Sequence, residues 1–444
     1  MTSATLSFGA AFAVYAASSY AVLQRVSDVV AQPYMDEIFH IPQAQRYCNG
    51  DFGVWDPKLT TPPGLYLLSM LPVHVQRRVV SGTTTSLCSV GYLRTTNWVL
   101  GMALFWVLAD LVSRLHPKRP VVSAATTLSL ALFPVSFFLQ HLYYTDTGSL
   151  LFVLGSYALS LRNRHFSAAF MGFVSLWFRQ TNAVWVAFVG FAAALRMVPE
   201  EVQLSGSVLV LGKWVVHRNV RGAIVWLLAP YLVVSGFFVA FVVVNQGIVL
   251  GDKSHHEAGL HVPQILYFFA YVVGSSMPLF AQMAGPLPWR SLVLALALGL
   301  TMTWAIGCCT IEHPFLLSDN RHYPFYVWKN VFRRHSLMRY LLLPLYGYAM
   351  TAVHHVLTAQ TSMLWQLALL ACTALVLVPS PLLEFRYFTV PYYLIRLHMR
   401  QPPRYTLAME IMWFVMINSV TIWVFLYRPF TWESEPGFLQ RFMW

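Results

Sequence analysis

The sequence predicts an all-α polytopic membrane protein, and three observations carry this prediction. Hydrophobic residues make up 57% of the 444 positions and charged residues only 10%, whereas soluble domains carry about 25% charged residues. Apolar runs of about twenty residues, long enough for a helix to cross a bilayer, recur along the whole chain. These runs do not alternate polar and apolar residues, as the strands of a membrane β-barrel do. We therefore expect mostly transmembrane helices joined by short loops.

The apolar runs divide into about twelve or thirteen predicted transmembrane helices. The run at residues 166–195 is interrupted by polar residues 178–182, so we expect two short helices there. The other predicted spans are residues 6–30, 90–111, 121–139, 150–161, 223–245, 262–283, 291–311, 337–356, 363–379, a weak span that ends at residue 397, and 407–427. The weak span leaves the side of the carboxyl terminus open.

Basic residues predict the orientation of the chain. Arg114, Lys118 and Arg119 follow the second span, and loops rich in Lys and Arg face the cytosol. The first loop, residues 31–89, is therefore expected on the luminal side, and the amino terminus in the cytosol. The same bias explains the formal net charge of +12, so we expect membrane lipid and no nucleic acid as a partner. We expect residues 1–444 to form a single integral membrane domain.

The first loop contains the longest polar interruption of the chain, residues 33–69. It holds four of the seventeen acidic residues: Asp36, Glu37, Asp51 and Asp56. Carboxylates next to a membrane span are costly and typically functional, so a reactive carboxylate is expected here. The Thr-Thr-Pro-Pro sequence at residues 60–63 predicts a helix start. We expect that helix to lie on the membrane surface and to run through residues 65–75.

Cysteine and histidine spacing give no metal motif. Cys48 and Cys88 fall in or near the first loop, where an oxidising lumen allows a disulfide; two free, partly buried thiols are the alternative. A second cluster invites a metal interpretation: His255, His256, Glu257 and His261. Its spacing matches no zinc motif, so we expect no metal and no cofactor, and a hydrogen-bonded loop instead.

Several polar segments are expected on the same luminal face as the first loop. They are residues 140–149, 178–182, 251–261, 313–336 and 382–388. Together they supply carboxylates, arginines, amides and aromatic rings. Aromatic faces stack on sugar rings, Asp and Asn bind hydroxyls, and Arg binds phosphate oxygens in a bidentate fork. This composition indicates a site for a sugar phosphate.

The sequences of four segments resemble those of a known family: PYMDEIFHIPQAQRYCNGDFGVWDPKLTTPPGLY, FRQTN, GDKSHHEAGLHVPQ and HPFLLSDNRHYPFYVWK. From about residue 30 to 400, the chain resembles the dolichyl-phosphate-glucose-dependent α-1,2-glucosyltransferases. The resemblance implies the GT-C membrane fold, a location in the endoplasmic reticulum membrane and a luminal active site. It also implies glucosyl transfer from dolichyl phosphate glucose to the diglucosylated oligosaccharide on dolichyl diphosphate. That transfer is the last step of lipid-linked oligosaccharide assembly for N-glycosylation.

The implied reaction inverts the anomeric centre, because the donor glucose is β-linked and the product bond is α. One base must then take the proton of the attacking hydroxyl. We expect Asp36 to be this base and Glu37 to be the alternative. Only one of the two can face the sugar, because neighbouring side chains on a helix point about 100° apart. His40, one turn further on, is expected to position Asp36. The alternative role for Asp36 is a carboxylate that caps a helix.

The leaving phosphate needs cations that hold it, because it then departs without protonation. The candidate phosphate-binding residues are Arg179, Arg321 and Arg386. The alternative for each arginine is an ion pair with an acidic residue: Asp146, Asp319 and Glu384, respectively.

Other polar and aromatic residues are candidates for binding the sugar or the acceptor glycan. They are His40, Trp55, Asp56, His256, Glu257, Asp319, Asn320 and His322. Local Asx-turn bonding is the alternative for residues 319–322, and anchoring at the membrane interface is the alternative for Trp55.

The alternative functions are a transporter or channel, a transferase of another dolichyl-phosphate sugar, and a non-catalytic regulator of membrane proteins. A transporter typically has ionisable residues on broken helices near the middle of the membrane. Here the carboxylates lie mostly at one predicted surface, beside a large loop. The pattern therefore favours the transferase.

Overall fold

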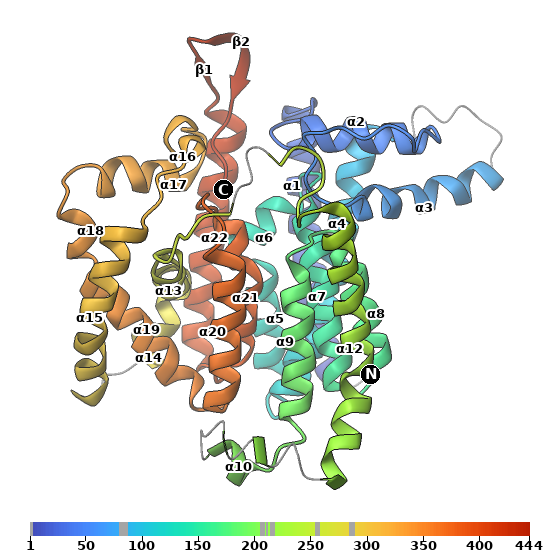
Figure 1. Ribbon diagram of the computed structural model, residues 1–444. Coiled ribbons are helices and arrows are strands. Elements are labelled where there is room, and N and C mark those ends of the chain that lie inside the picture. The colour runs from blue at the N-terminus through green and yellow to red at the C-terminus, as the bar shows by residue number, and fades with distance from the viewer. Residues whose placement is uncertain are drawn as a thin grey trace. The chain divides into compact units, whose positions relative to one another are not determined.

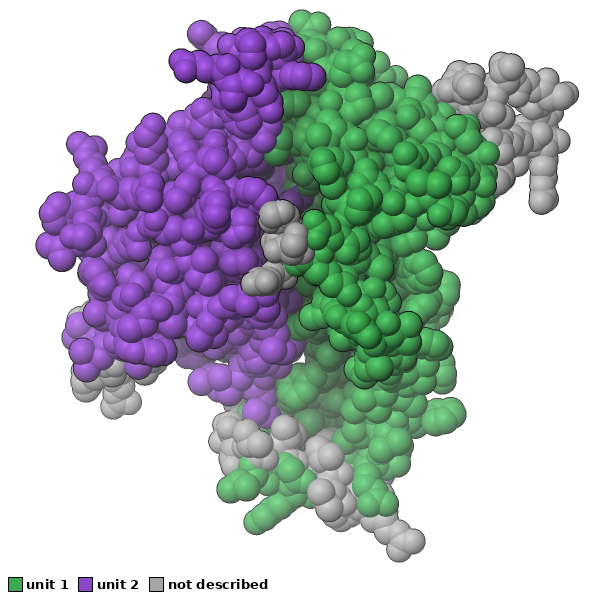
Figure 2. Space-filling view, turned by 45° about the horizontal axis from the view of Figure 1, so that its top comes forward, with its two compact units in different colours: residues 1–131, 136–256 green, residues 132–135, 257–444 purple. Residues whose placement is uncertain are grey.

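The computed structural model describes residues 3–79, 88–204, 218–253, 258–283 and 289–444, and also the single residues 209, 212 and 213. Helices account for nearly all of the regular structure in this part of the chain, as the sequence predicts (Figure 1). The chain forms two compact units (Figure 2). Unit 1 contains residues 1–131 and 136–256, and unit 2 contains residues 132–135 and 257–444.

Unit 1 holds the first polar loop and the helices around it. Its helices are α1 (Ser3–Val29), α2 (Glu37–Cys48), α3 (Gly64–Val79), α4 (Val90–Leu115), α5 (Pro120–Ala131), most of α6 (Pro134–Leu139), α7 (Thr145–Leu161), α8 (His165–Leu176), α9 (Asn182–Leu195), α10 (Glu200–Leu204) and α12 (Arg218–Asn245). In Figure 1, α2 and α3 run across the direction of α7, α8 and α9 at one end of these helices. The first polar loop therefore contains two helices, and α3, the one predicted from the sequence, starts directly after the Pro-Pro signal.

Unit 2 holds the remaining helices and a small hairpin. Its elements are α13 (Gln264–Ser275), α14 (Met277–Met283), α15 (Trp289–Cys309), α16 (Pro314–Ser318), α17 (Tyr323–Val327), the π-helix η2 (Trp328–Phe332), α18 (Met338–Leu341), α19 (Leu343–Leu357), α20 (Met363–Leu377), the 3-10 helix η3 (Phe385–Phe388), α21 (Thr389–Leu397), α22 (Arg404–Tyr427), β1 (Phe430–Trp432) and β2 (Glu435–Gln440). In its interior, Phe133 stacks on Tyr392 with ring centroids 3.9 Å apart. Arg396 and Glu410 form a buried ion pair at 2.8 Å between α21 and α22.

The described residues contain four helices long and apolar enough to cross a membrane, or five if the bent pair α13–α14 is one span. Five further apolar helices have only 10–17 residues. The all-α polytopic membrane fold is therefore as predicted, and the number of transmembrane helices, about twelve or thirteen with some of them short, stays a prediction. The predicted interruption at residues 178–182 is confirmed, because α8 ends at Leu176 and α9 begins at Asn182.

Three predicted single spans are divided into two helices beside a proline. They are residues 121–139, 262–283 and 337–356, and the prolines are Pro134, Pro278 and Pro344. Proline lacks the backbone N–H and its ring clashes with the carbonyl four residues earlier, so a helix stops before it and a new one starts with it in the first turn. At the break between α13 and α14 the direction changes by 87°.

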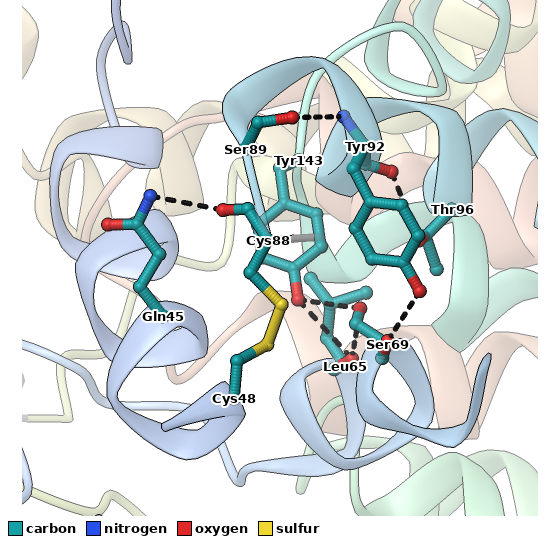
Figure 3. The surroundings of a disulfide bond; sticks show 9 residues. All are labelled: Gln45, Cys48, Leu65, Ser69, Cys88, Ser89, Tyr92, Thr96 and Tyr143. Atoms are coloured by element: carbon teal, nitrogen blue, oxygen red, sulfur yellow. Dashed lines mark hydrogen bonds between the residues drawn. A yellow bond between two sulfur atoms is a disulfide. The ribbon is translucent and has the colours of Figure 1, made fainter. Parts of the chain in front are cut away.

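A disulfide joins α2 to the residues that precede α4 (Figure 3). Cys48 at the end of α2 is bonded to Cys88, so the paired alternative is the one observed. Beside it, Gln45 Nε2 donates to the Cys88 carbonyl at 3.1 Å, and Tyr92 Oη donates to the carbonyl of Ser69 in α3 at 2.9 Å. Both helices of the first polar loop are thus fastened to the start of α4.

Replacing Cys48 and Cys88 by alanine is expected to destabilise unit 1. The two cysteines are 40 residues apart, and a cross-link over such a loop removes unfolded-chain entropy worth about 4 kcal/mol. We expect the melting temperature in detergent to fall for the double variant, and to fall equally for the wild type after reduction. Cys372→Ala, at a free cysteine, is the control. Identical melting of oxidised and reduced wild type would contradict this prediction.

Candidate functional site

The centre of the first polar loop is a completely buried ion pair. Arg94 of α4 donates from Nε to Oε1 of Glu37 at 2.8 Å and from Nη2 to Oε2 at 2.5 Å. The same two oxygens accept the backbone N–H groups of Tyr143 and Tyr34, at 2.7 Å and 3.1 Å. Arg94 Nη1 donates to the carbonyl of Val30 at 2.6 Å. Each oxygen of the carboxylate is therefore held by two donors, which is what a buried charge requires.

Asp36 lies directly before Glu37, at the N-terminus of α2, and its side chain is half-buried. The side chain makes no hydrogen bond that caps the helix, so the capping alternative has no contact to support it. The backbone N–H of Asp36 donates to the phenol oxygen of Tyr144 at 3.1 Å. The preceding residue, Met35, has φ 53°, which is a strained backbone conformation for a residue with a side chain. Such strain persists only where neighbouring contacts over-determine it, and the anchored Glu37 supplies such contacts.

His40 lies one turn after Asp36 and contacts α3. Its Nδ1 is 2.6 Å from the Oη of Tyr66, and the ring of Trp55 lies 6.0 Å from the ring of Tyr66. Burial raises the pKa of Tyr66 well above its usual range, and nearby groups that include Asp56 and Asp36 raise it further. The phenol therefore stays protonated. Two residues predicted from the sequence, His40 and Trp55, meet around a tyrosine that the sequence did not single out.

Asp56 and Trp55 belong to the segment that connects α2 to α3. Gln43 of α2 holds this segment, because its Oε1 accepts the N–H of Asp56 at 3.0 Å. The Asp56 carboxylate accepts the N–H of Lys58 at 2.9 Å, which is an Asx turn. Trp55 Nε1 donates to the carbonyl of Leu59 at 3.1 Å. Both predicted glycan-binding residues thus have local partners, and both side chains remain partly exposed.

Two other polar segments of unit 1 are fastened to the same connection. Gln180 Nε2 donates to the carbonyl of Thr60 at 2.6 Å, and the N–H of Asp252 donates to the carbonyl of Pro57 at 2.7 Å. Gly251 has φ +65°, and a Cβ at this position would lie 2.3 Å from the carbonyl oxygen of Pro57. Only glycine fits there. The first loop and two later segments therefore form one polar region.

All three arginines predicted to bind phosphate form ion pairs. The pairs are Arg179 with Asp146, Arg321 with Asp319, and Arg386 with Glu384. In the last two, the arginine forks onto an acid two residues earlier, so each pair belongs to one short segment. The six side chains are between 13% and 23% exposed, in contrast to the complete burial of Arg94. The ion pairs weighed as alternatives are therefore present, and the arginines remain partly accessible.

Asp319, Arg321 and His322 form one charge cluster between α16 and α17. His322 Nδ1 donates to the main-chain carbonyl of Trp444 at 2.6 Å, and its Nε2 lies 3.5 Å from Oδ2 of Asp319. Burial by itself raises the pKa of Asp319 and lowers that of His322, but hydrogen bonds and opposite charges outweigh burial. The pKa of the Asp319 carboxyl is therefore held well below its usual range, and the pKa of His322 is raised. An imidazole that faces an oxygen at both nitrogens favours its protonated form.

The segment that packs against this cluster was not among the predicted site segments. After α22, residues 430–440 form the hairpin β1–β2, and a short tail follows. Trp432 Nε1 donates to Oδ1 of Asn320 at 2.8 Å, and Gln440 Oε1 accepts from Nη1 of Arg321 at 2.9 Å. The available signal is RPFTWESEPGFLQRFMW, in which aromatic residues flank a polar Glu-Ser-Glu-Pro-Gly stretch, a pattern typical of a hairpin.

The cluster around His261 is only partly within the described residues. His255, His256 and Glu257 lie outside them. His261 is buried, with Nδ1 at 3.2 Å from the carbonyl of Pro381. Among the residues that the structure describes, no group of three His, Cys, Asp or Glu side chains is arranged to hold a metal ion.

The predicted site residues fall into two groups, one in each unit. Unit 1 contains Asp36, Glu37, His40, Trp55, Asp56 and Arg179, and unit 2 contains Asp319, Asn320, Arg321, His322 and Arg386. Three residues of these groups were not predicted as site residues: Arg94, Tyr66 and Gln440. Arg94 does have a signal, because a lone charge inside an apolar run needs a buried partner.

The sequence profile of the DIE2/ALG10 family matches residues 30–397, a range that includes both groups of residues. The chain belongs to this family. Family relatives named Dol-P-Glc:Glc(2)Man(9)GlcNAc(2)-PP-Dol alpha-1,2-glucosyltransferase include proteins of Mus musculus, Homo sapiens and Arabidopsis thaliana. Their identities to this chain are 38%, 36% and 33%, over 98%, 98% and 94% of the chain and 98%, 98% and 96% of the relatives. No solved structure matches the chain. The family profile ends at the last residue of α21, so the hairpin segment lies beyond it.

Arg94→Met is expected to destabilise unit 1 strongly. The substitution leaves the Glu37 carboxylate buried without its counter-charge, and breaking a buried pair in this way costs about 3–5 kcal/mol. Arg114→Met is the matched control: it removes an exposed pair with Asp110 and should cost less than about 1 kcal/mol. Unfolding of both variants in detergent measures the difference. Equal losses would show that the buried pair has no special weight.

The stability of unit 2 is expected to depend on the protonation of His322. Its pKa is raised in the folded chain, above the value of about 6.5 for an unfolded histidine. Protonation therefore stabilises the fold fully below pH of about 6.5, and this contribution is lost as pH rises through the raised pKa. Over that rise, the melting temperature of the wild type should fall more than that of His322→Gln. Parallel pH curves for the two proteins would refute the raised pKa.

Proposed function

We propose that this member of the DIE2/ALG10 family is an inverting glucosyltransferase. It transfers glucose in α-1,2 linkage from dolichyl phosphate glucose to the diglucosylated oligosaccharide on dolichyl diphosphate. The observation that carries the proposal is near full-length similarity to relatives with that named activity, such as the 38% identical protein of Mus musculus. These names favour the transferase over a transporter, a channel or a transferase of another sugar.

In this proposal Asp36 is the base that takes the proton of the attacking hydroxyl. A base needs an oxygen that the acceptor sugar can reach. Both oxygens of Glu37 are held by Arg94 and by backbone N–H groups, and the side chain is completely buried. Asp36 is half-buried and begins the same helix. Glu37 then acts as the anchor that fixes the backbone on which Asp36 stands.

His40, Trp55 and Asp56 bind the reacting sugars in this proposal. They surround Tyr66 close to Asp36, and together they offer aromatic faces and hydrogen-bonding groups. Sugar rings bind to this combination because their C–H faces stack on aromatic rings while their hydroxyls need polar partners. The same role is proposed for the residues of later segments: His256, Glu257, Asp319, Asn320 and His322.

Arg179, Arg321 and Arg386 are proposed to hold the phosphate of the donor and to stabilise dolichyl phosphate as it leaves. Each arginine is already oriented by a carboxylate partner. A cation that is oriented before the substrate arrives stabilises developing negative charge without reorganising during the reaction. The ion pairs are therefore compatible with a role in phosphate binding.

The apolar helices indicate a membrane protein, and we propose the endoplasmic reticulum membrane with the site on its luminal face. The Cys48–Cys88 disulfide supports this location, because disulfides persist in oxidising compartments such as the lumen. The GT-C fold is part of the same proposal.

Asp36→Asn is expected to abolish most glucosyl transfer while donor binding is retained. The amide keeps the size of the side chain but cannot accept the proton, and removal of a general base typically costs about 10²- to 10⁴-fold in rate. The assay supplies purified protein, dolichyl phosphate glucose and a diglucosylated lipid-linked acceptor. Asp51→Asn, an exposed carboxylate of the same loop, is the matched control and should keep full activity.

Two outcomes would contradict different parts of the proposal. Full activity of Asp36→Asn would remove the assignment of the base and turn attention to Glu37. Absence of transfer by the wild type, with well-folded protein and both substrates present, would overturn the proposed function itself.

A further inference from the structure

The segment after α22 is anchored to the end of that helix. Arg441 Nη1 donates to the carbonyls of Phe425 and Leu426 at 2.8 Å and 2.9 Å. The last carbonyls of a helix have no partner within the helix, so this side chain caps α22 from the tail. Figure 1 shows the hairpin continuing beyond the same end of α22. The hairpin and tail therefore have a fixed origin within unit 2.

From this anchor, the tail pairs with the segment that carries the charge cluster. The N–H of Met443 donates to the carbonyl of Arg321 at 2.7 Å, and His322 and Met443 form a parallel β-bridge. The ring of Tyr323 contacts the rings of Phe442 and Trp444, with centroids 4.4 Å and 4.5 Å apart. Backbone and side chains of the tail thus hold residues 321–323 in place.

The hairpin holds the Arg321 side chain directly. Gln440 Oε1 accepts from Nη1 at 2.9 Å, and Gln440 Nε2 donates to Glu435 Oε2 at 3.1 Å, which fixes the direction of the amide. The guanidinium carbon lies 4.5 Å from the ring centre of Trp432, a cation–π contact. Asp319 holds the opposite edge of the guanidinium through Nε and Nη2. The group is therefore held on two edges and one face.

The contacts from the hairpin fix the position of the Arg321 side chain within unit 2, which the ion pair with Asp319 does not do. Asp319 and Arg321 are two residues apart, so their ion pair orients the side chain within its own segment but does not fix that segment in unit 2. Gln440 and Trp432 connect the guanidinium to a hairpin that is capped onto α22. A cation waiting for a phosphate is more effective when its position is set before the phosphate arrives.

We infer that the hairpin and tail, residues 430–444, form a functional part of the phosphate-binding site, in which Gln440 and Trp432 are positioning residues for Arg321. The ligand is the phosphate of a dolichyl phosphate. This inference rests on the proposed function, because it assumes that Arg321 binds the donor phosphate.

The test uses the full chain in detergent and four variants. Gln440→Ala removes the hydrogen bond to Arg321, and Trp432→Ala removes the stacked ring. Trp432→Phe restores a ring beneath the guanidinium but not the hydrogen bond to Asn320. Phe438→Ala is the matched control, because this side chain of the same hairpin is 71% exposed. Melting temperatures establish that each variant is folded, and Gln440→Ala with Trp432→Phe keeps the test decisive if Trp432→Ala fails to fold.

Two readouts are compared: the KM and kcat for dolichyl phosphate glucose, and the Kd for dolichyl phosphate alone. Losing the hydrogen bond to Arg321 in Gln440→Ala, or the cation–π contact in Trp432→Ala, should raise KM and Kd about tenfold. The kcat should fall in the same two variants, because the proposed role of Arg321 includes stabilising the phosphate as it leaves. Trp432→Phe should lie close to the wild type, and Phe438→Ala should match it.

The outcomes separate this inference from the proposed function. Wild-type values of KM and Kd in folded Gln440→Ala would overturn the inference while leaving the glucosyltransferase in place. No transfer by the wild type, together with dolichyl phosphate binding that Gln440→Ala weakens, would overturn the function and support the inference. If the wild type neither transfers glucose nor binds dolichyl phosphate, both the proposed function and the inference are overturned. An equal fall in kcat and rise in KM across all variants, including Phe438→Ala, would indicate a merely structural role.

Discussion

The buried ion pair between Glu37 and Arg94 is the constraint on which the organisation of unit 1 depends. Removing two charges from water costs several kcal/mol per ion, so the pair persists only if every polar atom is satisfied. The donors and acceptors that satisfy it come from α4, from the turn before α2, from the end of α1 and from the segment that precedes α7. Four parts of the chain must therefore meet at one point. Asp36 and the strained residue Met35 stand directly beside that point.

Burial separates this pair from the other arginine–carboxylate pairs of the site. A completely buried pair has no exposed edge, so its role is to hold the fold. The pairs of Arg179, Arg321 and Arg386 keep part of their side-chain surface exposed, so they are not confined to holding the fold. Their value lies in orientation instead, since each carboxylate presets the plane of a guanidinium. In the proposed function, the same two residue types thus serve structure in one place and phosphate binding in another, according to exposure.

The sequence predicts the local features of this protein and two longer-range pairs, Arg179 with Asp146 and Cys48 with Cys88, but it misses the partner of Arg94. Apolar composition predicted a helical membrane protein, because a backbone in lipid must satisfy its own hydrogen bonds. Arg321 and Arg386 were matched with acids two residues away, and both pairs exist. Arg94 finds its acid 57 residues away, a distance over which no spacing rule operates. The hydropathy pattern does not distinguish proline from other residues of an apolar run. Because proline lacks the backbone N–H, three of the predicted single spans are in fact divided into two helices.

The charge of the cluster in unit 2 follows from which of its members are protonated. Asp319 carries a negative charge throughout the neutral range, because its pKa is held low, and Arg321 is always positive. These two charges cancel, so the net charge of the cluster is set by His322. Protonated His322 makes the cluster positive and attractive to a phosphate, and neutral His322 makes it neutral. The tail carbonyl of Trp444 accepts the Nδ1–H of His322, so the segment that positions Arg321 also orients the residue that decides the charge. In the proposed function, residues 430–444 thus help to position this cluster and to orient His322, whereas Asp319 contributes most to raising the pKa of His322.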